Sequence, residues 1–412
     1  MSRAVELSSE NSNSGTRRTH KLGVLGLGGR GCHFGIREFV EADPRVQIVA
    51  LCDLDPQKLQ EASNRYGDIV PGARLYTDMT TFLADPEVVA VINCTGDPQH
   101  AETGIACLEA GKHLYLEKPM AQTIADCDAL IEAWQRRPNV FMVGLELRYC
   151  TLFQDMRRLV DRGDIGRIVM GLVVDNVSVG GNYYFHGRKR REAYVGSLML
   201  EKGTHSLDLA NWFIGGHPRQ VFCSAGLDYY GRRKPNDLRC RDCGCADHCD
   251  YFVAREGFRM DYGAVLQYYP DGCVFAEEID VDDNSIVLVD YDNGARLSYL
   301  ECHFTPEYTR EFTFFGTEGK ITAFYNNEQD FVIRVQRRCN GREHVYYPEK
   351  HPGAHGGGDY RIVREFMDML DAGRPACKGI EGARDSAAIP IAALESARRN
   401  RPVVIPRVSP VE

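Results

Sequence analysis

Residues 21–42 read KLGVLGLGGRGCHFGIREFVEA, and this stretch decides the fold of the first half of the chain. An apolar run ends at Gly26, the pattern Gly-x-Gly-x-x-Gly continues to Gly31, and an amphipathic segment follows. A second apolar run ends in Asp53, 22 residues after Gly31. A strand, a glycine-rich turn, a helix and then an acid at this distance are the fingerprint of a dinucleotide-binding βαβ unit. The glycine pattern alone would be weak, but this context makes it specific.

Each position of the turn has a physical role. Gly26 permits the tight turn, Gly28 lets the backbone approach a pyrophosphate, and Gly31 lets helix and strand pack closely. The helix N-terminus offers free N–H groups and the positive end of a dipole. Arg30 is expected to add a positive charge beside the phosphates. The predicted cofactor contacts of the turn are Gly26, Gly28, Gly29, Arg30 and Gly31.

Asp53 is the predicted ribose ligand. Its carboxylate would accept hydrogen bonds from the adenosine ribose hydroxyls and repel a 2′-phosphate, which favours NAD over NADP. The alternative is a helix cap before PQKLQEA, since Asp-x-Asp-Pro is good capping chemistry. Asp55 suits that cap better, which leaves Asp53 for the ribose.

The hydrophobic pattern predicts two domains of α/β class. The strand-like runs are KLGVLGL, VQIVALCD, VVAVINCT, KHLYLE and VFMVGLE in the first half, and SIVLVDY, GARLSYLECHF, EFTFFG and GKITAFY in the second. The first set alternates with amphipathic segments, which indicates a parallel sheet and a Rossmann domain over residues 21–145. The second set is joined by the hairpin signals YPDGC, YDNGA and GTEGK. Residues 146–412 should therefore form an α+β domain with a mainly antiparallel open sheet, and residues 1–20 a disordered tail.

Composition excludes several classes of function. A chain of 412 residues, 43% hydrophobic and 26% charged, is typical of a soluble globular protein with two domains. The apolar runs are shorter than the ~20 residues needed to cross a bilayer. The net charge of −9 gives no reason to expect nucleic acid. The polar N-terminal tail lacks the apolar stretch of a signal peptide, so a cytoplasmic protein without nucleic-acid or membrane partners is expected.

The stretch LYLEKPMA, residues 114–121, places two opposite charges at the end of a buried strand. The carboxyl ends of strands in an open α/β sheet face the crevice where ligands bind, so Glu117 and Lys118 are site candidates. Burial and a cationic nicotinamide should loosen the proton of Lys118, and Pro119 stiffens the turn. The alternative is a surface ion pair without a catalytic role.

The order of these motifs resembles the Gfo/Idh/MocA oxidoreductase family. The resemblance rests on the glycine turn, on Thr-x-x-Pro-x-His at Thr95, Pro98 and His100, on Ala-Gly-Lys-His and on Glu-Lys-Pro, and it spans nearly the whole chain from Lys21. It implies that Lys118 lies beside the nicotinamide and contacts the reacting hydroxyl. Thr95, Pro98 and His100 are expected to shape the cofactor wall, although His100 could equally be an ordinary first-turn helix residue.

The resemblance extends to GSLMLEKGTHSLDLANWFIGG, residues 196–216. The family carries an acid four residues before a histidine here, which matches Glu201 and His205, with Glu in place of the usual Asp. Paired with Lys118, His205 is a candidate general base, and Glu201 would orient it or bind a neighbouring hydroxyl. The alternative for His205 is helix capping or core packing. Lys202, next to Glu201, matches no functional position.

Further residues are candidates for substrate contact. They are Arg148 and Tyr149 in ELRY, Tyr184 and His186 in NYYFHGRKRR, and His355 in HGGGD. The ELRY segment matches a region near the family's active site, and the glycine- and base-rich loop suits hydroxyls or an anionic substituent. The turn at His355 is loosened by glycines, and Asp359 after it is a further candidate for substrate contact, with capping of the next helix as the alternative.

The segment CRDCGCADHC brings Cys240, Cys243, Cys245 and Cys249 together in an insert over residues 238–251. A Cys-x₂-Cys knuckle favours a structural zinc ion, but the short spacing between Cys243 and Cys245 is awkward for one tetrahedron. An iron–sulfur cluster and disulfides or free thiols stay open as alternatives. The insert is expected to be structural and not catalytic.

The sequence thus predicts an NAD-dependent dehydrogenase that oxidises a secondary hydroxyl of a sugar, glycoside or cyclitol. One alternative is an enzyme that uses tightly bound NAD to oxidise, eliminate and reduce, with net glycoside cleavage. Another is a non-catalytic regulator that senses dinucleotide, against which Lys118 and His205 argue. The resemblance also implies a homodimer or homotetramer through the open sheet, because an exposed apolar face needs cover.

Overall fold

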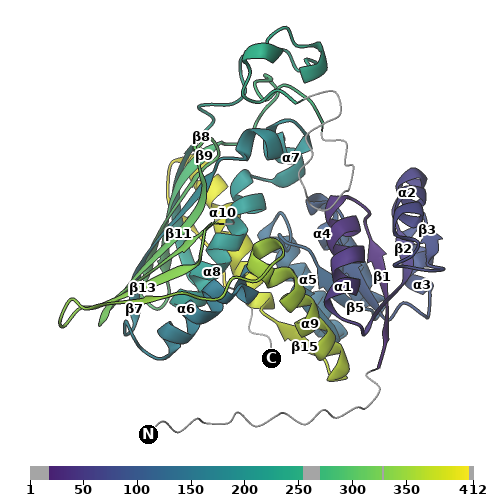
Figure 1. Cartoon of the computed structure of the whole chain (residues 1–412), viewed down its shortest axis with the longest axis horizontal. Coiled ribbons are helices and arrows are strands. Elements are labelled where there is room, and N and C mark those ends of the chain that lie inside the picture. The colour runs from purple at the N-terminus through teal and green to yellow at the C-terminus, as the bar shows by residue number, and fades with distance from the viewer. Residues whose placement is uncertain (1–17, 254–269, 327–328, 408–412) are drawn as a thin grey trace, which may run out of the picture.

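The structure, a computed structural model, describes residues 18–253, 270–326 and 329–407, and two sheets dominate it (Figure 1). Sheet A lies toward the right of Figure 1, and sheet B forms its left side. The predicted tail falls mostly on residues 1–17, outside the described residues, while His20 at its end begins the first strand. The predicted α/β class and the mainly antiparallel second sheet are confirmed.

Sheet A is parallel and contains the strand that leads into the glycine turn. Its described strands are β1 (His20–Leu25), β2 (Val46–Cys52), β3 (Arg74–Tyr76), β4 (Ala90–Asn93), β5 (His113–Leu116), β6 (Val140–Val143) and β15 (Ala376–Lys378). They pair in the order β15-β6-β5-β4-β1-β2-β3, and the sequence pattern predicts all but the short edge strands β3 and β15. The connection order reverses between β1 and β4, so a ligand crevice opens at their carboxyl ends.

Helices pack against both faces of sheet A. They are η1 (Gly31–Glu38), α1 (Phe39–Ala42), α2 (Pro56–Tyr66), α3 (Met79–Ala84), η2 (Asp97–Gln99), α4 (His100–Glu109) and α5 (Ile124–Arg136). Side chains fix where the longer helices begin. Asp55 accepts a hydrogen bond from the Gln57 N–H at 2.9 Å, as its predicted capping role requires, and Thr123 accepts one from the Asp126 N–H at 3.0 Å.

Sheet B alternates buried and exposed positions, because only one of its faces is covered by helices. Its described strands are β7 (Ile168–Val177), β8 (Pro218–Gly226), β9 (Asn284–Tyr291), β10 (Arg296–Cys302), β11 (Tyr308–Gly316), β12 (Gly319–Tyr325), β13 (Val332–Arg337), β14 (Glu343–Tyr346) and β16 (Val403–Val404). They pair in the order β14-β13-β12-β11-β7-β10-β9-β8-β16, with β7 and β10 parallel and the other described pairs antiparallel.

Two of the three predicted hairpins are confirmed. YDNGA joins β9 to β10, and GTEGK joins β11 to β12. The hairpin predicted at YPDGC is wrong where it is described, because Gly272 forms a bridge with Arg239 of the cysteine insert instead of turning between two long strands. Tyr269, its first residue, lies outside the described residues.

The second half also supplies helices and short helical turns. They are η3 (Glu146–Tyr149), α6 (Thr151–Asp161), η4 (Gly181–Phe185), η5 (Arg188–Arg190), α7 (Glu192–Val195), η6 (Met199–Gly203), α8 (Thr204–Ile214), η7 (Cys240–Asp242), η8 (Ala246–His248), η9 (Ala354–Gly357), α9 (Gly358–Asp371) and α10 (Ile380–Arg399). Helices α6, α8 and α10 lie on one side of sheet B (Figure 1), and Leu207 and Leu209 of α8 are fully buried in that core. Among the described helices, none combines the length and the apolar character that crossing a membrane requires.

The end of the chain returns to sheet A. Strand β15 pairs with β6, and Phe366 of α9 packs against Phe39 and Tyr115, with ring centroids 6.3 and 5.7 Å apart. The division of the chain at residues 145 and 146 remains a prediction, but the described strand β15 from the second part completes the sheet of the first.

Candidate active site

A cavity of about 730 Å³ opens at the carboxyl ends of β1, β4 and β5 and is lined by residues from both halves of the chain. The predicted site residues in its lining are Gly29, Arg30, Thr95, His100, Glu117, Lys118, Tyr184, Glu201, His205 and His355. Among the lining side chains without a predicted role are Asp97, Glu146, Lys189, Lys202, Tyr308 and Arg310. This space is called the redox cavity below. It joins the predicted cofactor residues to the predicted catalytic residues.

The glycine turn has the geometry that a dinucleotide requires. Gly26 has a φ of +88°, which favours glycine, and a Cβ on Gly31 would lie 1.9 Å from the carbonyl oxygen of Gly26. A Cβ on Gly28, by contrast, would meet no heavy atom of the described residues within 4 Å. The turn is therefore closed toward the sheet and open at Gly28, where a pyrophosphate would approach.

Asp53 lies at the end of β2 beside this turn. Its carboxylate accepts hydrogen bonds from the Leu27 N–H at 2.8 Å and the Asp55 N–H at 2.9 Å, and Lys58 Nζ is 4.0 Å away. The acid is thus fixed against the glycine turn by backbone donors, as a ribose ligand of this fold should be. Together with the open side of Gly28, these residues fit a bound dinucleotide.

The positive charge that Arg30 was expected to add beside the phosphates is bound by carboxylates in the structure. Its Nε donates to Glu117 at 2.8 Å, its Nη2 donates to Asp359 at 2.7 Å, and Nη2 also bonds Glu146. Burial would lower the pKa of Arg30, but these three carboxylates raise it well above its usual value. The guanidinium therefore gathers carboxylates from three distant segments. The alternative capping role of Asp359 is wrong, since its carboxylate bonds Arg30 and His355.

The predicted cofactor wall is only partly in place. His100 is buried, and its ring nitrogens lie 2.6 Å from the Pro119 carbonyl oxygen and 3.1 Å from the Thr95 carbonyl oxygen. The ring thus connects the turn after β4 to the turn after β5. Thr95 and His100 line the redox cavity, whereas Pro98 lies outside its described lining and its neighbour Asp97 is the residue that faces the space.

Lys118 and Glu201 meet across the redox cavity. Lys118 Nζ donates to the Glu201 carbonyl oxygen at 2.8 Å and to Glu201 Oε2 at 3.2 Å. Burial would lower the pKa of Lys118, but Glu201 raises it above its usual value. The described side chains therefore do not loosen the proton of Lys118 as expected, because a carboxylate faces the ammonium. The ammonium stays charged at neutral pH.

Lys189 is a site residue that the sequence reading missed. It bonds Glu201 Oε1 and donates to the Tyr183 hydroxyl at 3.2 Å. Burial would raise the pKa of Glu201, but Lys118 and Lys189 lower it far below its usual value. Glu201 thus holds two lysines, not His205 as predicted. The only signal for Lys189 was its place in the basic run RKRR, which does not single out one side chain.

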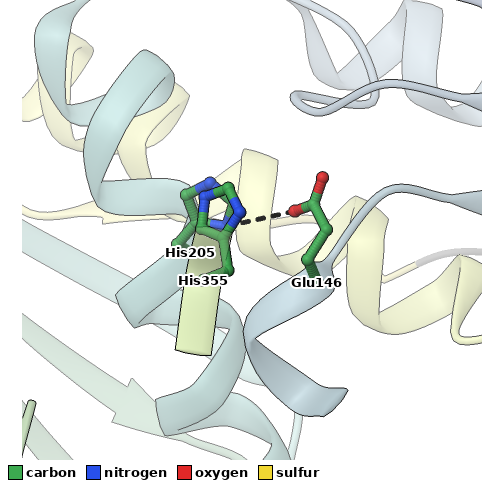
Figure 2. A group of neighbouring side chains, drawn as sticks. All are labelled: Glu146, His205 and His355. Atoms are coloured by element: carbon green, nitrogen blue, oxygen red, sulfur yellow. Dashed lines mark ion pairs between the residues drawn. The ribbon is translucent and has the colours of Figure 1, made fainter. Parts of the chain in front are cut away.

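His205 faces Glu146 and His355 at the other side of the redox cavity (Figure 2). His205 Nδ1 lies 3.9 Å from Glu146 Oε2, and the two imidazole centroids are 5.2 Å apart. Burial lowers the pKa of His205 well below its usual value, and Lys118 and His355 lower it further. The ring is therefore neutral at pH 7 and can accept a proton. The same burial raises the pKa of Glu146 to about 7, although Arg30 opposes this.

The three side chains of Figure 2 could also hold a metal ion by spacing, since one ligand atom from each lies within 4.8 Å of the others. The charges around them are mixed. Arg30 already bonds Glu146, and Lys118, Arg310 and Lys202 all lie near enough to lower the pKa of His205. These cations would oppose a divalent ion beside His205, whereas Glu117 and Asp359, which raise the pKa of Glu146, would attract one.

Glu146 could have been found by the rule that found Glu117. It follows β6 at the same sheet edge where Glu117 follows β5. His355 adopts φ 50° and ψ 34° in a turn with Gly356 and Gly357, which brings its ring into the redox cavity. Burial would lower the pKa of His355, but Asp359, which accepts its hydrogen bond at 2.7 Å, raises it.

Three predicted substrate residues lie elsewhere. Arg148 forms two hydrogen bonds with Asp208 at 2.6 and 2.7 Å, below α8, and Tyr149 packs against the core of sheet A. Both are outside the lining of the redox cavity. His186 lies beside the cysteine insert, with Nδ1 2.8 Å from the Gly272 carbonyl oxygen. Of this group, Tyr184 and His355 remain candidates for substrate contact.

Lys202, for which no role was predicted, lines the redox cavity and bonds the Tyr308 hydroxyl at 2.5 Å. Burial would raise the pKa of Tyr308, but Lys202 and Arg310 lower it to about 7. A partly ionised phenol therefore faces the space near the lysines. The residues come from η6 and β11, which are 106 positions apart, so the sequence offers no sign that they meet.

The predicted cysteine set is also revised. Cys240, Cys243 and Cys249 surround a second, small cavity together with Cys273, whereas Cys245 is exposed. Cys273 lies outside the predicted insert over residues 238–251 and joins it through Gly272, which pairs with Arg239. All four thiols around this small cavity are free in the structure.

Comparison with known proteins agrees with this architecture. Residues 20–145 match the oxidoreductase family with an NAD-binding Rossmann fold, and residues 153–322 match the Gfo/Idh/MocA C-terminal domain. The Bacillus subtilis (strain 168) protein YteT is 26% identical over 379 residues, 83% of this chain and 87% of its own. Myo-inositol 2-dehydrogenase of Thermotoga maritima is 22% identical over 390 residues, 94% and 99% of the two chains.

A solved structure of levoglucosan dehydrogenase in complex with NADH and levoglucosan has a similar fold. Its TM-score is 0.74 at 20% identity, over 95% of this chain and 100% of that chain. The two family matches fall on the two sheets that enclose the redox cavity. The chain therefore belongs to the Gfo/Idh/MocA family of oxidoreductases, and its first domain is an NAD-binding Rossmann fold.

Proposed function

We propose that the protein is an NAD-dependent dehydrogenase that oxidises a secondary hydroxyl of a sugar, glycoside or cyclitol. The observation that carries this proposal is the pairing of a neutral base, His205, with a charged ammonium, Lys118, in one cavity that also reaches the glycine turn. Alcohol oxidation needs a proton acceptor and a group that stabilises negative charge on oxygen. Both are present beside the proposed cofactor site.

The preference for NAD over NADP rests on Asp53. Its carboxylate is fixed against the turn by the Leu27 N–H, which leaves a negative charge where the 2′-phosphate of NADP would lie. The open side of Gly28 would receive the pyrophosphate, and Thr95 and Glu117 would face the cofactor from the turns after β4 and β5. When bound, NAD supplies the acceptor for the hydride that leaves the substrate carbon.

In this scheme His205 takes the proton of the hydroxyl, and Lys118 stabilises the developing alkoxide. Glu201 acts as a positioning residue for Lys118, because both its carbonyl and its carboxylate accept hydrogen bonds from Nζ. Glu146, 3.9 Å from His205, would receive or share the proton. Its pKa of about 7 suits transfer at neutral pH.

The substrate class is inferred from the lining. Lys189, Tyr184, Lys202 and Tyr308 offer donors and acceptors to several hydroxyls on one small ring. The relatives named as levoglucosan and myo-inositol dehydrogenases take their names from such polyhydroxylated rings. A sugar or cyclitol would satisfy more of these groups than a simple alcohol.

We also propose that the uncovered face of sheet B forms a homo-oligomer interface. Met170 and Leu172 of β7 and Ile286 and Leu288 of β9 are exposed large hydrophobic side chains, and the strands that carry them are separated by β10 alone. Adjacent exposed apolar side chains mark association surfaces. Ile286→Lys combined with Leu288→Lys should convert the oligomer to monomers in analytical ultracentrifugation, whereas a monomeric unaltered protein would refute the interface.

A panel of sugars, glycosides and cyclitols tests the function directly. We expect NADH to accumulate with at least one compound, and both His205→Ala and Lys118→Ala to abolish that signal while still binding NAD. Glycoside cleavage without net NADH would instead indicate an oxidation, elimination and reduction cycle. NAD binding without turnover of any compound would favour a dinucleotide-sensing protein and overturn the proposal.

A further inference from the structure

A second cavity lies at the cysteine insert and shares none of its described lining residues with the redox cavity. It measures about 20 Å³, room for one water-sized particle. The donor atoms around it belong to His186, Cys240, Cys243, Cys249 and Cys273. Four sulfurs and an imidazole nitrogen around a space of this size are the ligand types that zinc prefers.

Backbone contacts assemble this donor set without help from the thiols. The Cys240 N–H donates to the Asp271 carbonyl oxygen at 2.7 Å, and the Cys273 N–H donates to the Leu238 carbonyl oxygen at 2.9 Å. Arg241 adds two hydrogen bonds to the Asp271 carboxylate, at 2.6 and 2.7 Å. The frame therefore holds Cys273 against the Cys240–Cys243 knuckle although the two are 30 positions apart.

His186 lines this cavity, and its Nδ1 lies 4.0 Å from Cys240 Sγ. The residue is 2% exposed, and its Nδ1 lies 2.8 Å from the Gly272 carbonyl oxygen, so Nδ1 carries the proton and Nε2 a lone pair. Nε2 is buried and has no hydrogen-bond partner among the described residues. A metal-bound histidine has the same arrangement.

We infer that this cavity is a structural Zn²⁺ site in which Cys273 and three of the donors His186, Cys240, Cys243 and Cys249 complete a tetrahedron. Among the described residues, no three of these donor atoms lie within 4.8 Å of one another. Zinc would deprotonate these thiols and draw them inward by rotation of their side chains.

Such an ion would also steady the redox cavity. His186 directly follows η4, which carries Tyr183 and Tyr184, and Lys189 lies three positions further along the same loop. These residues line the redox cavity, whereas His186 and Cys273 line the second cavity at the cysteine insert. Zinc would therefore fasten the loop that delivers Lys189 to Glu201.

Metal analysis distinguishes this donor set, which includes Cys273, from the set predicted from the sequence, which includes Cys245. Unaltered protein purified without added metal should contain about one zinc ion per chain. Cys273→Ser should lose it, and Cys245→Ser, the matched control from the same insert, should retain it. Absence of zinc from the unaltered protein, or loss from Cys245→Ser with retention in Cys273→Ser, would overturn the inference.

A second measurement covers the case in which Cys273→Ser fails to fold. Unaltered protein stripped with a chelator and reloaded with Co²⁺ should show the intense absorption of a tetrahedral thiolate complex. Cys245→Ser should give the same spectrum. Iron in the purified protein, or cobalt that binds without thiolate bands, would exclude the site, and neither result depends on which alcohol the enzyme oxidises.

Discussion

The two ends of the redox cavity are built differently. At the cofactor end, Gly31 lies so close to the Gly26 carbonyl oxygen that a side chain on it would clash. At the reacting end, the Glu201 carboxylate lies between two lysines, Lys118 and Lys189. The first end is built by backbone and by missing side chains within one short segment. The second is built by side chains from the turn after β5 and from η5 and η6. A backbone-built site depends on shape, so substitutions there should change binding. A side-chain-built site depends on charge, so substitutions there should change turnover.

The largest effect should come from breaking the reacting end. Lys118→Ala is expected to lower turnover by about 10²- to 10⁴-fold, the usual contribution of a proton-handling group, while NAD affinity stays nearly unchanged. Steady-state kinetics and calorimetric titration with NAD measure the two quantities. Lys21→Ala is the control, because Lys21 forms an exposed ion pair with Glu87. Near-normal turnover of Lys118→Ala would show that Lys118 has no catalytic role and that residues 114–121 are only the end of a strand.

The cofactor end can be broken in two distinguishable ways. Gly31→Ala places a Cβ 1.9 Å from the Gly26 carbonyl oxygen, so both stability, by about 1–3 kcal/mol, and NAD binding should fall. Gly28→Ala adds the same atom where no described heavy atom lies within 4 Å. It should keep its melting temperature and lose only NAD affinity. Equal NAD affinity of Gly28→Ala and the unaltered protein would show that the pyrophosphate lies elsewhere.

Cofactor choice should respond more modestly. Asp53→Ala is expected to narrow the ratio of NAD to NADP affinity by about tenfold, or about 1.4 kcal/mol, because the repulsion of the 2′-phosphate is lost. Asp55→Ala is the matched control: it removes the cap of α2 and should lower the melting temperature without changing the ratio. Similar NAD and NADP affinities in the unaltered protein would contradict the role of Asp53.

The smallest effect concerns pH. The pKa of His205 is lowered by burial and by positive neighbours, so the acid limb of kcat/KM should lie below pH 6.5. His355→Gln removes one of those positive charges, so the pKa of His205 should rise and the acid limb should move to higher pH by less than about one unit. His344→Gln, at an exposed position of strand β14, is the control and should leave the limb unchanged. A shift to lower pH, or none, would show that His205 does not govern the limb.

The same pKa has a consequence for stability. His205 in the folded protein resists protonation, whereas in the unfolded chain it titrates near its ordinary value of about 6.5. As the pH falls below that value, His205 binds a proton in the unfolded chain but stays neutral in the folded chain. The folded state should therefore lose stability in that range, and His205→Gln should lessen the loss.

Sequence predicted the backbone-built end better than the side-chain-built end. The glycine turn, Asp53 and Asp55 lie within one contiguous unit whose spacing is fixed by strand and helix geometry. Lys118 and Glu117 follow from the rule for strand ends. Arg30 shows the limit, since its partners Glu117, Glu146 and Asp359 lie 87, 116 and 329 positions away.

The failures in the second half have the same physical cause. Arg148 looked available for substrate because nothing in ELRY indicates that Asp208, 60 positions later, pairs with it. His186 looked like a hydroxyl ligand, although the Asp271–Gly272 turn draws it to the cysteines. Cys273 could not be grouped with Cys240 because the bridge between Arg239 and Gly272 is a tertiary contact. Pairings of this kind become visible only once the sheets are assembled.

Strand β15 bears on how the protein is made. It borders β6 in the dinucleotide-binding sheet, yet its residues 376–378 leave the ribosome some 230 positions after that strand. Until then β6 presents an open edge with unpaired backbone groups, which invites pairing with other nascent chains. Asp359, which anchors Arg30, is translated just as late. The first domain is thus synthesised first, but its sheet is completed only when the last part of the chain has been made. Chaperones could protect its open edge during this interval.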